Sequence, residues 1–337
     1  MIVNVTRGNR VESVHQVAAC AADAAGTPLL VDGDIETPVF LRSSAKPFIA
    51  AAALATGVRD AFGLDEREVA VMCASHTGER FHVDAVASIL RKIGMHESDL
   101  QCGAHLPYNE ASAQALLRRG EPASALHNNC SGKHAGILAM CKMIGADTST
   151  YMDVDNPVQV QILAFCARLS DDDPATWPLG VDGCGIPVYA TGLRKAAMAF
   201  ARFATLDGVR DEDAAALLAA RDAMIAYPEY VSGTGEFDAE LMRAGAGEIA
   251  CKVGAEGVHA VALPPQRAGF ALKVLDGAGR ARPPATMAGL RALGARAALA
   301  TELSGWAQPV VYNRAGRPVG SVRPASDFAV EQASTRN

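Results

Sequence analysis

The two ends of the chain carry apolar residues in the patterns typical of β-strands. Branched residues recur through residues 1–8 and 11–31, and the run DAAG at 23–26 indicates a turn inside the second segment. The same signal returns late in the chain, where the last segment predicts a hairpin. These late segments are residues 248–263, 269–277 and 309–324.

The middle of the chain carries its apolar residues at helical spacing. Residues from about 64 to 226 are mostly helical by this criterion, with loops rich in Gly, Pro, Asn and Asp between the periodic segments. Ahead of them, residues 44–57 predict a compact alanine-rich helix that Gly57 ends. Pro47 falls in its first turn, where a missing N–H costs little.

Strands at both ends with helices between them predict an α+β fold rather than alternating β-α-β units. We expect one antiparallel sheet built from both termini, with a mostly helical insert beside it, in a single catalytic unit over residues 1–337. The sheet-containing part is expected at about 1–60 plus 245–337, and the helical part at about 61–244.

Composition narrows the partners and the location. The 337 residues include 31 basic and 37 acidic side chains, a net charge of −6, which disfavours a nucleic-acid or anionic-membrane surface. The start of the chain lacks the pattern of a secretion signal, and no apolar run approaches the roughly 18–20 residues that span a bilayer. We therefore expect a cytoplasmic protein, whose eight cysteines are buried thiols, metal ligands or reactive groups.

The stretch RSSAKP places Ser43 one helical turn before Lys46, so the two side chains share a face. A serine hydroxyl needs a neighbouring base to become a nucleophile, and a lysine can serve when its surroundings favour the neutral form. The alternative is a serine N-cap followed by a solvated lysine. Arg42 is next to the pair and could bind a carboxylate.

Two further segments bring hydroxyls and an amine. In CASHTGERFH, Ser75, His76 and Thr77 precede Gly78, in a loop where the backbone can approach a ligand or simply cap the next helix. In CKVGAEG, Lys252 lies in a predicted strand. It could project into a cleft or lie at a sheet edge.

Two cysteine motifs are candidates for a metal site. In HNNCSGKHAG, Cys130 and Lys133 lie three residues apart at a predicted helix start, and GVDGCGIP adds Cys184 in a glycine-rich loop. Two cysteines alone do not make a zinc site. From the residues alone a third ligand could come from four side chains, which are His127, Lys133, His134 and Asp182.

Taken together and in this order, the motifs RSSAKP, CASHTGE, HNNCSGKHAG, GVDGCGIP and CKVGAEG resemble the thermolabile or type-3 zinc-containing L-asparaginases. The resemblance covers nearly the whole chain. It implies a fold similar to serine β-lactamases, penicillin-binding proteins and glutaminases. It also implies an amidohydrolase that converts L-asparagine to L-aspartate and ammonia through a Ser-Lys acyl-enzyme.

The resemblance implies roles for individual residues. Ser43 with Lys46, and Ser75 with Lys252, look like two catalytic tandems, with Ser43 as the expected nucleophile. Cys130, Lys133 and Cys184 match the Zn²⁺ ligands of the family. Arg42, His76 and Asp182 are candidates for substrate binding, and His134 and Asp182 for support of the metal ligands.

The alternatives are a glutaminase or another serine amidohydrolase of the same fold, or a non-catalytic zinc-bearing scaffold. Val253 replaces the hydroxyl of the K-T-G motif, so a β-lactam substrate is not expected. Zinc is expected to aid substrate binding rather than to supply the attacking hydroxide. Helices with exposed apolar residues and the habit of the family suggest a homodimer.

Overall fold

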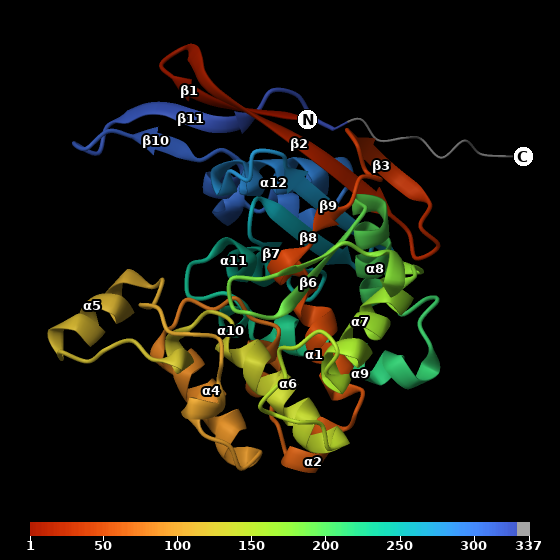
Figure 1. The fold of residues 1–337 in the computed structure, drawn as a ribbon. Helices are drawn as coiled ribbons and strands as arrows, with labels where there is room; N and C mark the ends of the chain where they lie inside the picture. Colours follow the sequence, from red (N-terminus) through yellow and green to blue (C-terminus); the bar gives the residue numbers. More distant parts are fainter. Residues whose placement is uncertain (329–337) are drawn as a thin grey trace, which may run out of the picture. The chain divides into compact units, whose positions relative to one another are not determined.

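A computed structural model describes residues 1–328 of the chain. Within this range the chain forms two compact units (Figure 1). The first unit contains residues 1–44, 190–208 and the segment from 240 onward. The second contains residues 45–189 and 209–239.

An antiparallel sheet forms the centre of the first unit, with the strand order β10-β11-β1-β2-β9-β8-β7 and β3 paired with β2. Strands from both ends of the sequence are neighbours in it, since β1 pairs with β11 and β2 with β9. This topology confirms the predicted α+β fold. The strands are β1 (Ile2–Arg7), β2 (Arg10–Ala22), β3 (Pro28–Asp32), β7 (Ala250–Gly254), β8 (Val258–Leu263), β9 (Ala268–Val274), β10 (Val310–Tyr312) and β11 (Pro318–Pro324).

Two helices of the first unit, α8 (Leu193–Thr205) and α12 (Arg282–Ala292), pack on opposite faces of this sheet (Figure 1). On one face, a Cβ at Gly269 of β9 would lie 2.8 Å from the backbone carbon of Phe200 in α8. On the other face, Phe270 points at Gly289 of α12. Successive side chains of a strand point to opposite faces, so one dipeptide of β9 serves both helices.

The second unit is mostly helical. Most of the helices predicted for the middle of the chain lie in it, among them α4, α6 and α7. Its helices are α1 (Lys46–Leu54), α2 (Val58–Phe62), α3 (Glu66–Met72), α4 (Arg80–Lys92), α5 (Glu110–Arg118), α6 (Ser131–Ile144), α7 (Pro157–Ser170), α9 (Asp211–Ala226) and α10 (Pro228–Val231). In the sequence the limit between the units falls inside α11 (Phe237–Ala244), and α13 (Ser304–Ala307) belongs to the first unit.

The limits of the two units differ from those expected. Helix α1 was expected with the sheet but belongs to the second unit, because it packs against α6, α7 and α9. Helix α8 was expected in the helical part but belongs to the first unit, because it packs on β9. The predicted loop at 170–187 also contains the start of a hairpin, in which β5 (Leu179–Val181) pairs with β6 (Pro187–Thr191). A short strand β4 (Val39–Phe40) pairs with the end of β6 in the first unit.

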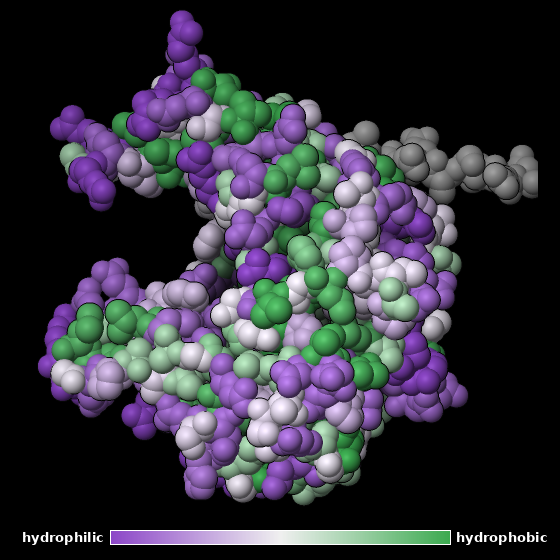
Figure 2. Space-filling model, in the orientation of Figure 1, coloured by the Kyte–Doolittle hydropathy of each residue, from purple (hydrophilic) through white to green (hydrophobic). Residues whose placement is uncertain are grey.

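Exposed apolar side chains gather around α5 in the second unit, where Leu106, Tyr108 and Leu117 are 44%, 66% and 60% exposed. Figure 2 shows hydrophobic residues in green at the lower left, where Figure 1 places α5. A homodimer stays a prediction. Among the described residues, no helix combines the length and the apolar character that crossing a membrane requires.

Candidate functional site

The Lys46 side chain is the centre of a polar cluster in the second unit. It is the first residue of α1, it is followed by Pro47, and it is only 1% exposed. Its Nζ donates to Ala74 O at 2.7 Å, to Ser75 Oγ at 2.9 Å and to Cys130 Sγ at 3.1 Å. A buried amine needs such partners because an unpaired polar group in the interior costs several kcal/mol.

Ser75 lies in the loop after α3, where Val231 O accepts a hydrogen bond from its backbone N–H at 3.0 Å. The residue is half-buried, so Ser75, which contacts Lys46 through its hydroxyl, is in part accessible. The adjacent His76 is fully buried. One ring nitrogen lies 2.9 Å from Ser131 Oγ, and the other accepts from Gly78 N at 3.2 Å. Both nitrogens are thus engaged with the protein, which favours a positioning role for His76 over substrate contact.

Close packing of two helices brings Cys130 to Lys46. A Cβ at Gly132, in the first turn of α6, would overlap the carbonyl oxygen of Val71 and lie 2.7 Å from its carbonyl carbon. Glycine therefore lets the start of α6 touch the backbone of α3. Because α3 leads into Ser75 and α6 follows Cys130, this contact holds the hydroxyl and the thiol on either side of the Lys46 amine.

Cys130 and Cys184 are both 5% exposed and are hydrogen-bonded to each other. The hydrogen bond from Cys184, with the ammonium groups of Lys46 and Lys133, holds the pKa of Cys130 well below its usual value. The same bond and burial raise the pKa of Cys184. The two shifts are opposite, so loss of a proton from this pair is favoured at Cys130 over Cys184.

Lys133 completes this group, since its Nζ lies 2.9 Å from Cys184 Sγ and its side chain is 2% exposed. Burial opposes the charge of Lys133, but the neighbouring sulfurs of Cys130 and Cys184 outweigh it and raise its pKa. The three side chains that match zinc ligands of the resembled family thus lie together inside the second unit.

The two residues expected to support the ligands lie next to Lys133. His134 is fully buried, and one of its ring nitrogens lies 2.7 Å from the Tyr151 hydroxyl. Burial and then the charges of Lys133 and Lys46 hold its pKa well below the usual value. Asp182 is the first residue of the turn that carries Cys184. Its carboxylate accepts a hydrogen bond from Gly183 N at 2.7 Å, and its negative charge raises the pKa of Lys133.

This donor set fits a thiophilic cation such as Zn²⁺. Lys133 Nζ lies 2.9 Å from Cys184 Sγ, Cys130 is hydrogen-bonded to Cys184, and the lowered pKa of Cys130 favours the thiolate form that binds a metal. The buried His134 Nε2 has no hydrogen-bond partner among residues 1–328, which leaves a polar position beside the group for a water. Lys133 would bind a metal only after losing its proton.

The first unit holds the other predicted site residues. Ser43 and Arg42 lie in the short 3₁₀ helix Arg42–Ala45, and Arg42 has a left-handed φ of 52°. Such backbone strain in a residue with a side chain is common at functional sites. A Cβ at Gly254 would lie 2.6 Å from Leu41 O, so β7 approaches the segment that leads into Ser43.

Lys252 of β7 is fully buried, with its Nζ 3.1 Å from Val253 O. Sequence reasoning gave it a surface alternative at a sheet edge. Its burial in β7 leaves the functional interpretation as the one that we carry forward. A pair of possible metal ligands also lies in this unit, since Cys251 Sγ and a ring nitrogen of His259 are within 4.8 Å of each other.

The structure therefore brings together Lys46, Ser75, Cys130, Lys133, His134, Asp182 and Cys184 in the second unit. Sequence reasoning missed the direct contact of Lys46 with Ser75 and Cys130, because 29 and 84 residues separate these partners. It also missed Tyr151, whose hydroxyl orients His134 and which no motif singles out.

Comparison with known families identifies the family to which nearly the whole chain belongs. The family described as L-asparaginase II matches residues 3–324. The chain belongs to the L-asparaginase II family. This membership confirms the predicted family and supports an amidohydrolase of the asparaginase type. No curated protein sequence matches the chain significantly.

Solved structures give more distant likenesses. The chain is similar to a structure described as Mglu in its native form, with 14% identity, a TM-score of 0.43, and coverage of 78% of this chain and 60% of that one. It is also similar to a beta-lactamase from Mycobacterium bovis, with 16% identity, a TM-score of 0.42, and coverage of 78% and 88%. The chain thus spans less than two thirds of the length of Mglu.

Proposed function

We propose that this protein is an L-asparaginase that hydrolyses the side-chain amide of L-asparagine to L-aspartate and ammonia through an acyl-enzyme. Membership of the L-asparaginase II family supports the reaction class. The observation that carries the mechanism is the buried Lys46 amine, 2.9 Å from the half-buried hydroxyl of Ser75. A lysine held against a serine hydroxyl is the arrangement that a Ser-Lys amidohydrolase needs.

In the proposed reaction Ser43 attacks the amide carbon, because its spacing puts it one turn from Lys46. The Ser43 Oγ–C bond forms while the neutral Lys46 amine takes the hydroxyl proton. The C–N bond then breaks as a proton reaches the leaving ammonia through the hydrogen bond from Lys46 to Ser75. Water hydrolyses the resulting ester by the reverse proton path, and the backbone N–H of Ser43 is one donor to the oxyanion.

The other residues bind and orient in this proposal. Lys252 acts with Ser75, as the resemblance implies, and Arg42 and Asp182 contact the charged groups of the substrate. His76 holds the Ser75 loop through its bonds to Ser131 and Gly78. Cys130, Lys133 and Cys184 would hold Zn²⁺, whose positive charge would help to orient the substrate when it is bound. A cytoplasmic location and a homodimer remain predictions.

Ammonia release from L-asparagine and L-glutamine by the purified protein tests the function. We expect asparagine to be preferred, although a pocket wall discriminates one methylene by only about 1–3 kcal/mol. Ser43→Ala and Ser75→Ala should each lower kcat by at least about 100-fold, and Ser149→Ala, an exposed serine, should not.

Mass spectrometry of an acylated protein then assigns the nucleophile. An acyl group on Ser43 supports the proposal, whereas one on Ser75 reverses the two roles. Faster turnover of glutamine would favour the glutaminase alternative. No ammonia from either amide by a folded, zinc-loaded protein would leave only the scaffold.

A further inference from the structure

The second unit contains a pocket that the proposed chemistry does not use. Its volume is about 310 Å³, and it lies among α1, α6, α7 and the start of α9. Ala52, Met140 and Ala164 contribute an apolar wall. Arg168, Arg210 and Asp213 contribute a charged one. A volume at the low end of the range for ligand sites suits a small molecule with an apolar and a charged part.

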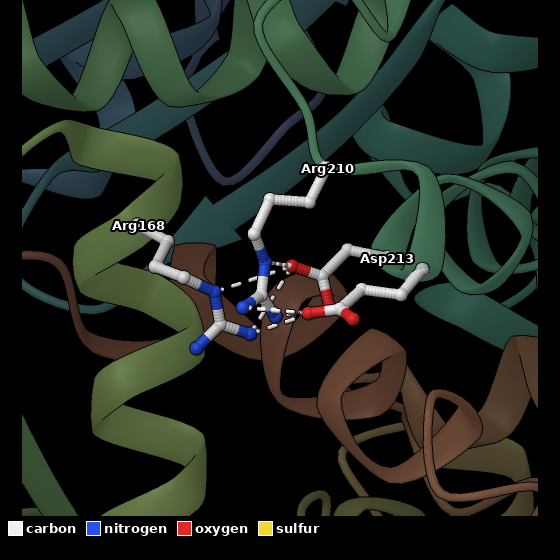
Figure 3. A network of polar contacts seen from close by, with 4 residues as sticks. Arg168, Arg210 and Asp213 are labelled. Carbon is white, nitrogen blue, oxygen red and sulfur yellow. Dashed lines mark hydrogen bonds and ion pairs between the residues drawn. The ribbon is translucent and has the colours of Figure 1, made fainter.

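The charged wall is a compact network (Figure 3). The Asp213 carboxylate, whose side chain is 7% exposed, accepts from Nε of Arg210 at 2.9 Å and from Nη2 of Arg168 at 3.1 Å. The two guanidinium groups point at it from different elements, Arg168 from α7 and Arg210 from the residue before α9. Glu212 adds a second carboxylate 2.6 Å from Nη1 of Arg210. A buried carboxylate between two cations fixes the geometry of this wall.

The charges of the network cancel, with two guanidinium groups and two carboxylates. A simple anion or cation would be attracted by one pair and repelled by the other. A zwitterion fits both. Arg210 is half-exposed, and its contacts with Asp213 and Glu212 leave donor hydrogens on both Nη atoms for a carboxylate. Glu212, 67% exposed, offers oxygens to an ammonium.

Two walls of the pocket lead to the candidate site. Lys46 begins α1, which reaches the pocket at Ala52, six residues or about 9 Å further along the helix. Cys130 precedes α6, which reaches the pocket at Met140. A ligand that shifts either helix along its axis would move the Lys46 amine or the Cys130 sulfur.

We propose that this pocket binds a free α-amino acid with an aliphatic side chain and that its occupancy regulates the enzyme. The carboxylate binds Arg210, the ammonium binds Glu212, and the aliphatic chain contacts the wall of Ala52, Met140 and Ala164. The binding part stands apart from the proposed function, and the regulatory part rests on it.

Calorimetric titration of the full chain with L-leucine tests the binding part. We expect a dissociation constant at or below about 1 mM. L-Leucinamide, which lacks the carboxylate, and 4-methylpentanoate, which lacks the ammonium, should each bind at least about tenfold more weakly, since each loses one charge-assisted contact. No heat of binding with L-leucine up to about 10 mM, or equal binding of all three compounds, overturns the site.

Variants locate the binding. Ala164→Leu fills the pocket from a partly exposed helix position, and Arg210→Gln removes the guanidinium. Each should weaken L-leucine binding at least about tenfold without unfolding the chain, as thermal melting would verify. Val160→Leu, an exposed position of the same helix outside the pocket, is the matched control and should bind normally. Unchanged binding in Ala164→Leu places the ligand elsewhere.

Asparagine hydrolysis with and without L-leucine tests the regulatory part. A change of at least twofold in the wild type that Ala164→Leu abolishes supports regulation. The same change in both proteins would mean competition at the catalytic site and overturns it, as would binding with no change in rate. If neither protein hydrolyses asparagine, the proposed function fails, while the titration still decides the binding site.

Discussion

Replacing Gly132 with alanine should lower both stability and activity, because it disrupts the contact between α3 and α6 that positions the candidate site. A Cβ at this position would overlap the Val71 carbonyl oxygen and lie 2.7 Å from its carbonyl carbon. Both atoms belong to the backbone of α3, so α3 and α6 must separate. Overpacking of this kind costs about 1–3 kcal/mol, against a gain of about 0.5–1 kcal/mol for alanine over glycine in a helix.

Gly136→Ala in the same helix is the matched control. Its Cβ would meet the Met72 side chain, with the terminal methyl carbon at 2.8 Å. A methionine side chain can move away at little cost, so the helical gain and the repacking nearly cancel. We expect Gly132→Ala to be the less stable of the two by about 2 kcal/mol in urea unfolding.

Activity should separate the two variants further. Moving α6 away from α3 withdraws Cys130 from the Lys46 amine, now 3.1 Å away, and shifts Lys133 with it. A displacement of about 1 Å can cost about 100-fold in rate, so we expect a loss of that order for Gly132→Ala and little loss for Gly136→Ala. If Gly132→Ala is as stable and as active as the wild type, the contact of the two helices does not set the site.

Three further predictions follow from the buried charges of the second unit. Lys46→Met should lower kcat about 10²–10⁴-fold in the ammonia assay, and Lys142→Met, at an exposed lysine, should not. Zinc binding should release about two protons, from Lys133 and Cys184, because the pKa values of both are raised. Calorimetry in buffers of different ionisation heat measures this release, and the zinc affinity should rise with pH. Binding that does not depend on pH would contradict this ligand set. Burial lowers the pKa of His82 to about 4, so as the pH falls the unfolded chain takes up a proton at this residue before the folded chain does. Urea unfolding should therefore show a loss of stability of about 2 kcal/mol between pH 7.5 and pH 5. The variant His82→Gln should show a smaller loss.

Periodicity predicted most of the fold because each segment repeats its own pattern. The strands at both ends and the long helices such as α6 and α7 follow from spacing alone. The β5–β6 hairpin was not predicted because β5 has only three residues, in a stretch rich in glycine and proline. The sequence also did not predict that α8 belongs to the first unit. It depends on Gly269 of β9 admitting the helix, which is a property of the packed pair.

The candidate site was predictable where one short motif carries it and not where the fold assembles it. Cys130 and Lys133 share a helix start, so their proximity follows from spacing. Resemblance alone paired Ser75 with Lys252. Within the second unit, the amine that contacts the Ser75 hydroxyl is that of Lys46. That contact depends on the packing of α1, α3 and α6 against one another, and Gly132 of α6 is one local sign of it.

The buried ionisable groups of the second unit compensate one another electrostatically. Lys46 and Lys133 are two amines with almost no exposure, so positive charge on both at once would be costly in a medium of low dielectric. The hydrogen bond from Cys184 and then the charges of both lysines lower the pKa of Cys130 although it is buried, and negative charge there compensates the two amines. A metal cation bound at the sulfurs would replace the positive charge of Lys133, which must then be neutral. A metal ion at this site would therefore change the charge next to Lys46 through the Cys130 sulfur, which the Lys46 amine contacts at 3.1 Å.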